Sequence, residues 1–143
     1  MGREHEVPQT DQLYLFPRES RPLDKHAEPP LPDRFKAGNP ERLFIGEDPL
    51  QNYLKDFGKG WVIRFRAILF EQDASGFIEK YKTTGRKPYH PFLILGLILY
   101  GAQMGRWSLR QLEDLAKFEL GAWWICGGLQ PDHSTIGDFI HLH

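Results

Sequence analysis

From residue 50 onward, apolar side chains recur at helical spacing, and polar side chains fill most of the positions between them. Apolar residues at i, i+3, i+4 and i+7 predict an amphipathic helix with Asp48 as its N-cap and Pro49 as its first residue, ended by Gly58. The same period predicts a second helix over residues 61–70 and a shorter third helix over residues 75–81. The first helix carries the clearest pattern, which is formed by Leu50, Tyr53, Leu54 and Phe57.

Residues 91–104 are the most apolar segment, and we expect them to form the central helix of the core. Pro91 can open a helix, and apolar side chains on nearly every face predict burial on several sides. A buried strand is the alternative for so short an apolar run, but the opening proline and the helical pattern that follows favour a helix. Gly96 and Gly101 lower helix propensity by about 1 kcal/mol each, so we expect each to allow close packing against another helix.

Two later helix starts are marked by capping residues. Ser108 and Gln111 fit a capping box, in which each side chain satisfies an orphan backbone N–H at the helix start. Asp132 or Ser134 is the expected N-cap of the last helix. A short helix over residues 121–126 is predicted between these two.

Residues 1–47 differ in composition from the rest of the chain, because they hold seven of the eleven prolines. Each proline removes a backbone donor and restricts the residue before it, so we predict an irregular proline-rich arm over residues 1–47. Residues 48–143 are predicted to form one compact, multi-helix, all-α domain with helix-turn-helix-like elements.

The net charge of −1 hides an uneven distribution of basic residues. Six basic side chains and no acidic one fall within residues 80–110. A solvated surface is one explanation for such a block, and a nucleic-acid interface is the other. The single cysteine, Cys126, rules out a disulfide framework within the chain, and the sequence lacks a signal peptide and a membrane-length apolar run. We therefore expect a soluble, cytoplasmic protein.

The residues do not have the spacing that metal or nucleophilic catalysis requires. The six histidines include no His-x-x-x-His pair, and there is no Cys-x-x-Cys. Cys126 lies between two tryptophans and a Gly-Gly turn, so we predict a small buried apolar residue there. We expect no catalytic residue, no metal site and no cofactor. Helix capping and solvated faces explain the acidic pairs better than a two-metal site does: Glu113 with Asp114, and Asp132 with Asp138.

Nucleic-acid binding is the chemistry that the residues favour. Helix starts bind phosphate through free N–H groups and a local positive potential. Residues 106–110 and 132–135 place basic and small polar side chains at two such starts. Ordinary capping explains the serines equally well, so this pattern alone leaves both interpretations open.

Residues 88–139 contain four short blocks whose order and spacing resemble the N-terminal domain of insertion-sequence transposases of the DDE class. The resemblance implies a helical domain ahead of a ribonuclease-H-like catalytic domain, which uses three acidic residues and divalent metal to cut and join DNA. It also implies that the helical part binds the terminal repeats of the element and helps to assemble the complex. The blocks are Pro88-Tyr89-His90-Pro91 with the apolar run that follows, residues 105–113 (GRWSLRQLE), residues 123–129 (WWICGGL), and residues 131–136 (PDHSTI) followed by Phe139.

The leading hypothesis is therefore the DNA-binding and assembly domain of a transposase, lacking the catalytic domain and not an enzyme on its own. Its expected partners are the terminal inverted repeats of the element and either further copies of the chain or a full-length transposase. Asp138 departs from the family pattern, because many relatives carry a basic residue near this position. The residues expected to contact DNA are Arg86, Lys87, Arg106, Ser108, Arg110, His133, Ser134 and Thr135.

Two alternatives stay open at this point. The first is a helical interaction module that makes no DNA contact and inhibits transposition by pairing with its partner. The near-neutral net charge and the Trp123-Trp124 pair favour it. The second is an inactive, truncated remnant of a transposase.

Overall fold

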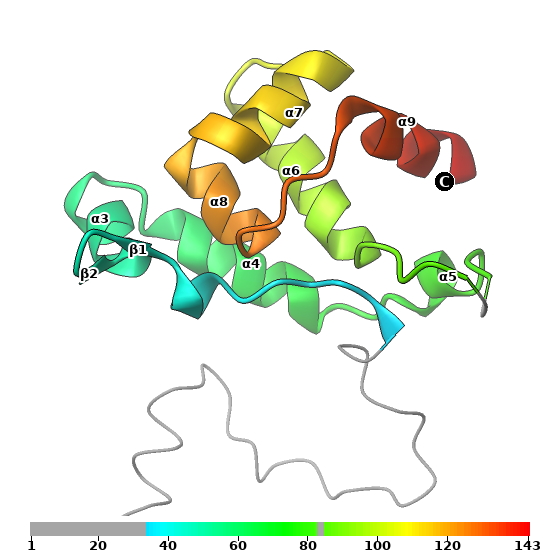
Figure 1. The fold of residues 1–143 in the computed structure, drawn as a ribbon, viewed down its shortest axis with the longest axis horizontal. Coiled ribbons are helices and arrows are strands. Elements are labelled where there is room, and N and C mark those ends of the chain that lie inside the picture. Colours follow the sequence, from blue (N-terminus) through cyan, green and yellow to red (C-terminus); the bar gives the residue numbers. More distant parts are fainter. Residues whose placement is uncertain (1–33, 83–84) are drawn as a thin grey trace, which may run out of the picture. The chain divides into compact units, whose positions relative to one another are not determined.

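The computed structural model describes residues 34–82 and 85–143, which fold into helices joined mostly by short connections (Figure 1). The prediction of an all-α domain is confirmed, because these residues contain seven α-helices and one small two-stranded sheet. Residues 1–33 of the predicted arm lie outside the described residues. The elements are η2 (Pro40–Arg42), β1 (Phe44–Ile45), β2 (Asp48–Pro49), α3 (Leu50–Asp56), α4 (Trp61–Glu71), α5 (Ser75–Ile78), α6 (Pro91–Gln103), α7 (Leu109–Phe118), α8 (Leu120–Cys126) and α9 (His133–Leu142).

Helix α6 is central to the hydrophobic core, as its sequence predicts. Eight of its thirteen residues are buried, and the helix contacts α4, α7, α8 and α9 (Figure 1). Its glycines allow this close packing. A Cβ atom on Gly96 would lie 2.8 Å from Cγ2 of Ile125, and one on Gly101 would clash with Leu112. The predicted role of the two glycines is thereby confirmed.

The described end of the predicted arm packs on the helical body. Lys36 forms a parallel β-bridge with Tyr89, and its backbone hydrogen bonds to the residues on either side of Tyr89 measure 2.7 and 2.8 Å. The neighbouring Phe35 is only 1% exposed. The segment satisfies its backbone groups through these long-range contacts.

Two predicted helix boundaries are wrong. Asp48 and Pro49 do not begin a helix, because they pair as β2 with the antiparallel strand β1, and α3 begins at Leu50. Helix α5 ends at Ile78 and does not continue to Tyr81. The Tyr81 ring instead packs against residues that are distant in the sequence, which ends the helical course of the chain.

Candidate nucleic-acid interface

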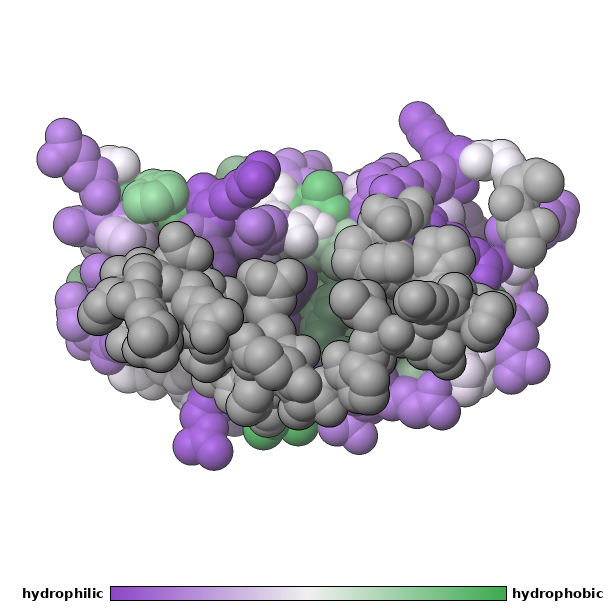
Figure 2. Space-filling model, turned by 90° about the horizontal axis from the view of Figure 1, so that it is seen from below, coloured by the Kyte–Doolittle hydropathy of each residue, from purple (hydrophilic) through white to green (hydrophobic). Residues whose placement is uncertain are grey.

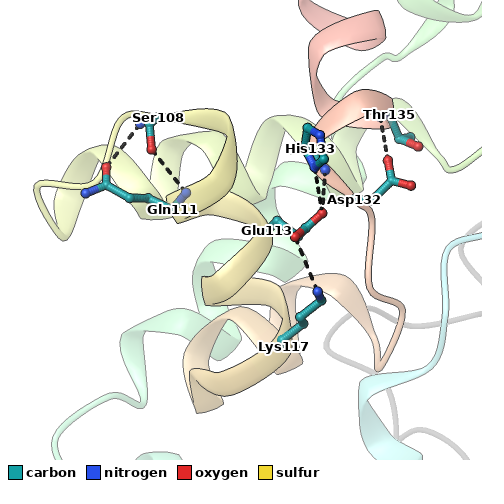
Figure 3. Close-up of polar contacts among 7 residues, drawn as sticks. All are labelled: Ser108, Gln111, Glu113, Lys117, Asp132, His133 and Thr135. Carbon is teal, nitrogen blue, oxygen red and sulfur yellow. Dashed lines mark hydrogen bonds and ion pairs between the residues drawn. The ribbon is translucent and has the colours of Figure 1, made fainter.

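The start of α7 is held by the capping box that the sequence predicts (Figure 3). Ser108 Oγ accepts from the Gln111 N–H at 3.1 Å, and Gln111 Oε1 accepts from the Ser108 N–H at 3.1 Å. Arg106 and Arg110 flank this cap and are exposed, and Trp107 between them is 73% exposed. The cap carries no charge. It therefore does not offset the positive potential of the helix start or the charge of the two guanidinium groups.

The start of α9 carries two carboxylates (Figure 3). Asp132 is the N-cap, and its Oδ1 accepts from the Thr135 N–H at 2.8 Å, so Asp132 rather than Ser134 fills this position. Glu113 reaches the same helix start from α7. Its Oε1 accepts from the His133 N–H at 2.9 Å and lies 3.0 Å from His133 Nδ1. Two of the first-turn N–H groups that a phosphate would need are thus occupied by side chains.

Hydrogen bonds keep both carboxylates ionised. The His133 N–H and then the His133 ring lower the pKa of Glu113 to about 2, and Lys117, whose Nζ lies 3.3 Å from Oε2, contributes further. The Thr135 N–H likewise lowers the pKa of Asp132. Both groups are therefore negatively charged at neutral pH and offset the positive end of the α9 dipole.

A cleft of about 410 Å³ lies between α9 and the connection from α5 to α6. Arg86 and Lys87 line it from the connection, and Thr135 lines it from α9, so the fold brings these three predicted residues together. Asp132 and Asp138 also line the cleft from α9. The cleft therefore combines cations from one segment with carboxylates from another.

The eight residues expected to contact DNA fall in three places. Arg106, Ser108 and Arg110 belong to the start of α7, and Arg86, Lys87 and Thr135 belong to the cleft. His133 and the exposed Ser134 lie in the first turn of α9. Leu109, the first residue of α7, packs on α9, since a Cβ atom on Gly137 would lie 3.2 Å from its Cδ1. The start of α7 therefore lies beside α9 (Figure 3).

The predicted contact residues do not include Lys36 and Trp107, two further side chains of these regions. Lys36 lines the cleft, although it lies fifty positions before Arg86 in the sequence. Only its bridge to Tyr89 places it there, and the sequence carries no signal for that contact. Trp107 could have been found, because it stands between two arginines immediately before the helix cap.

His90 is a buried polar residue with a structural role. It is 4% exposed, and its Nδ1 accepts from the Phe92 N–H at 3.0 Å, which caps α6. Burial and then the nearby Arg66 guanidinium lower the pKa of His90 to about 4. The Arg66 guanidinium already has hydrogen-bond partners, because it donates to the backbone oxygens of Ile125 and Ala37 at 2.9 and 2.8 Å.

The described residues offer little to other chemistry. Cys126 is completely buried, and burial raises the pKa of its thiol to about 12, so the prediction of a small buried apolar residue is confirmed. In residues 34–82 and 85–143, no three His, Cys, Asp or Glu side chains lie together in a way that could hold a metal ion. No helix in these ranges has both the length and the apolar character needed to cross a membrane.

Comparison with known proteins gives one match. A family model described as Transposase domain (DUF772) matches residues 61–142. This range includes α4 to α9 and all eight residues expected to contact DNA. Neither the curated proteins nor the solved structures contain a match to the chain.

Proposed function

Since the chain belongs to the Transposase domain (DUF772) family, we propose that it is the DNA-binding and assembly domain of an insertion-sequence transposase of the DDE class. The observation that carries this proposal is the start of α7. There Arg106 and Arg110 are exposed next to a neutral cap, and the exposed Trp107 stands between them in the sequence. Chain cutting and joining belong to a catalytic domain of the transposase, and no residue of this domain takes part in them.

DNA binding rests on phosphate contacts from two groups of cations. Arg106 and Arg110 make one group, and Arg86 and Lys87 make the other. Phosphate contacts position a protein on the duplex and release counterions, so affinity depends strongly on salt. Ser108 caps α7, and His133 joins the start of α9 to Glu113. The hydroxyls of Ser134 and Thr135 add polar contacts from α9.

The DNA partner is the terminal inverted repeat of the element, and the site of action is the cytoplasm. Assembly brings together further copies of the domain or a full-length transposase. Two side chains with large exposed apolar areas favour such contacts: Phe118 is 77% exposed and Phe57 is 71% exposed. Figure 2 shows hydrophobic areas among hydrophilic side chains on the face that it views. An interaction module without DNA contact is the second candidate function.

A salt titration of DNA binding tests the proposal. The full chain is mixed with a labelled duplex of mixed sequence, and the association constant is measured by fluorescence anisotropy over a range of salt. Each phosphate contact adds about 0.9 to the slope of log K against log salt, so Arg106→Ala with Arg110→Ala should reduce it by about 2. Arg86→Ala with Lys87→Ala should behave similarly.

The matched control removes the same charge elsewhere. Lys55 on α3 and Arg64 on α4 are exposed, and their double alanine variant should leave the slope unchanged. If all three variants have the wild-type slope, or if the wild type binds no duplex, the DNA-binding proposal is wrong. Self-association measured by sedimentation would then support the interaction module.

A further inference from the structure

The cleft beside α9 has the dimensions of a ligand site. Its volume is about 410 Å³, within the range of about 300–1,000 Å³ that is usual for such sites. Contacts between Phe77 and Phe139, and between Lys80 and the backbone of Leu142, hold α9 against the segment that contains α5 and leads into the other wall. The cleft is therefore a built feature of the fold and joins segments that are distant in the sequence.

Three cations line the cleft: Lys36, Arg86 and Lys87. Lys36 is the best fixed, because backbone hydrogen bonds anchor it and its Nζ lies 4.1 Å from the centroid of the Tyr89 ring. The ion pairs among the described residues involve none of these three cations.

Aromatic side chains line the same cleft. Tyr81, Tyr89 and Phe139 contribute to it, and both tyrosines are half-buried. Burial raises the pKa of both phenols, so they are neutral at physiological pH. The Tyr81 ring already packs against Phe35 and His143, and Lys36 lies over one face of the Tyr89 ring. The other face of Tyr89 is therefore the surface left for an unpaired base.

Helix α9 adds carboxylates that a bare phosphate site would not contain. Asp132 already accepts a hydrogen bond from the Thr135 N–H. Asp138 is exposed and lines the cleft, and it forms no ion pair with another described residue. A carboxylate repels the backbone of a duplex but accepts a hydrogen bond from the exocyclic amino group of a base. A single nucleotide can satisfy both kinds of group, because its phosphate and its base edge are separated.

We propose that this cleft binds one unpaired nucleotide of a DNA strand, a role that rests on the DNA-binding function proposed above. The three cations hold its phosphate, Tyr89 contacts the face of its base, and Asp138 accepts from an exocyclic amino group. Thymine has no such group, so the cleft prefers cytosine, adenine or guanine over thymine.

Three labelled DNA duplexes test this proposal with the full chain. One is blunt, and the other two carry a single unpaired dC or dT on the same strand end. We expect the dC extension to bind at least about fivefold more tightly than the dT extension, since a correct base contact contributes about 1–3 kcal/mol of discrimination. The ratio of the two affinities is the readout, because a general change in charge affects both equally.

Two variants assign the preference to Asp138. Asp138→Asn should bring the dC-to-dT ratio close to one while the blunt duplex still binds. Asp114→Asn makes the same change of charge at an exposed position on α7, outside the cleft, and should keep the wild-type ratio. Tyr89→Leu should reduce the gain from either extension.

The outcomes separate the two proposals. If the blunt duplex binds with the expected salt dependence but both extensions add nothing, or if Asp138→Asn keeps the preference, the nucleotide site is wrong and the DNA-binding function stands. If the wild type binds none of the three duplexes, the DNA-binding function fails and the nucleotide site fails with it.

Discussion

Helices α7 and α9 both begin with a side chain that accepts the backbone N–H three residues along the chain. In α7 this side chain is the neutral Ser108, and in α9 it is the charged Asp132. Glu113 adds a second negative charge at α9, whereas exposed arginines flank the cap of α7. Similar local sequences therefore produce one helix start with a neutral cap between basic side chains and another whose dipole is offset by two carboxylates.

The difference shows that the charge at a helix start depends on side chains from neighbouring elements as well as on its own cap. Glu113 is twenty residues before His133, the residue whose N–H it accepts. The cations near α9 come from outside that helix, across the cleft. We therefore expect direct phosphate contact at the start of α7, and contact near α9 only through the cleft.

The largest expected effect concerns a third helix start, that of α6, where the cap is the buried His90. Its pKa falls from 6.5 to about 4 on folding, so the unfolded chain binds more protons between these values. Stability should be complete above pH 6.5 and fall by about 3 kcal/mol as the pH drops to 4. Urea unfolding across this pH range measures the loss.

His90→Asn supplies a capping oxygen in place of the ring nitrogen and does not titrate, so it should flatten the pH dependence between 6.5 and 4. His141→Asn, which changes an exposed histidine, is the matched control and should retain the wild-type dependence. Titration of the His90 ring by NMR in the wild type serves as a second readout if His90→Asn does not fold. A ring that titrates at its ordinary value would contradict the role of burial.

A smaller effect should follow from removing the cap of α7. Ser108→Ala loses the acceptor for the Gln111 N–H and should lower the free energy of unfolding by about 1 kcal/mol. Ser134→Ala changes an exposed serine that is not a cap and should stay within about 0.5 kcal/mol of wild type. Equal losses in the two variants would show that the capping box does not stabilise α7.

Adding a negative charge at the start of α7 should weaken DNA binding, and removing one at the start of α9 should strengthen it. Ser108→Asp keeps a capping oxygen but adds a carboxylate, and should weaken duplex binding at low salt by about threefold. Glu113→Gln removes a charge from α9 and should strengthen binding by a similar factor. Glu71→Gln, at the exposed end of α4, is the control for a distant change of charge.

Glu113→Gln should also alter the behaviour in acid. The folded pKa of Glu113 is about 2 and its unfolded value is 4.5, so this carboxylate stabilises the fold above pH 4.5 and loses that contribution as the pH falls toward 2. The variant should lack this part of the acid dependence. An unchanged acid dependence together with unchanged DNA binding would rule out a charged Glu113 at the start of α9.

The smallest expected change in stability is that of Trp107→Ala. Because Trp107 is 73% exposed, its loss should change the free energy of unfolding by no more than about 0.5 kcal/mol. Duplex binding should nevertheless weaken, since this ring stands between the two arginines. Phe118→Ala, which removes a ring that is 77% exposed at the end of α7, should leave duplex binding unchanged.

The sequence was a good guide wherever the signal was local. The apolar period and the Ser108–Gln111 box predicted α4, α6 and α7 closely, and Asp132 was one of two expected caps for α9. These features depend on residues within a few positions of each other, so the pattern contains them.

Long-range contacts were not predictable in the same way. The bridge between Lys36 and Tyr89, and the capping of α9 by Glu113, join residues that are distant in the sequence and leave no periodic trace. They decide which cations share the cleft and which helix start is negative. The sequence could therefore propose candidate interface residues, whose own test is DNA binding, but not their grouping or local charge.

The most direct test of the contrast between the two helix starts is an NMR titration of the ¹⁵N-labelled full chain with a duplex of mixed sequence. We expect the largest amide shifts at residues 106–111 and at residues 85–89, with smaller shifts at His133 and Thr135, whose N–H groups already bind carboxylates. Shifts concentrated at the first turn of α9, with none at 106–111, would contradict this account.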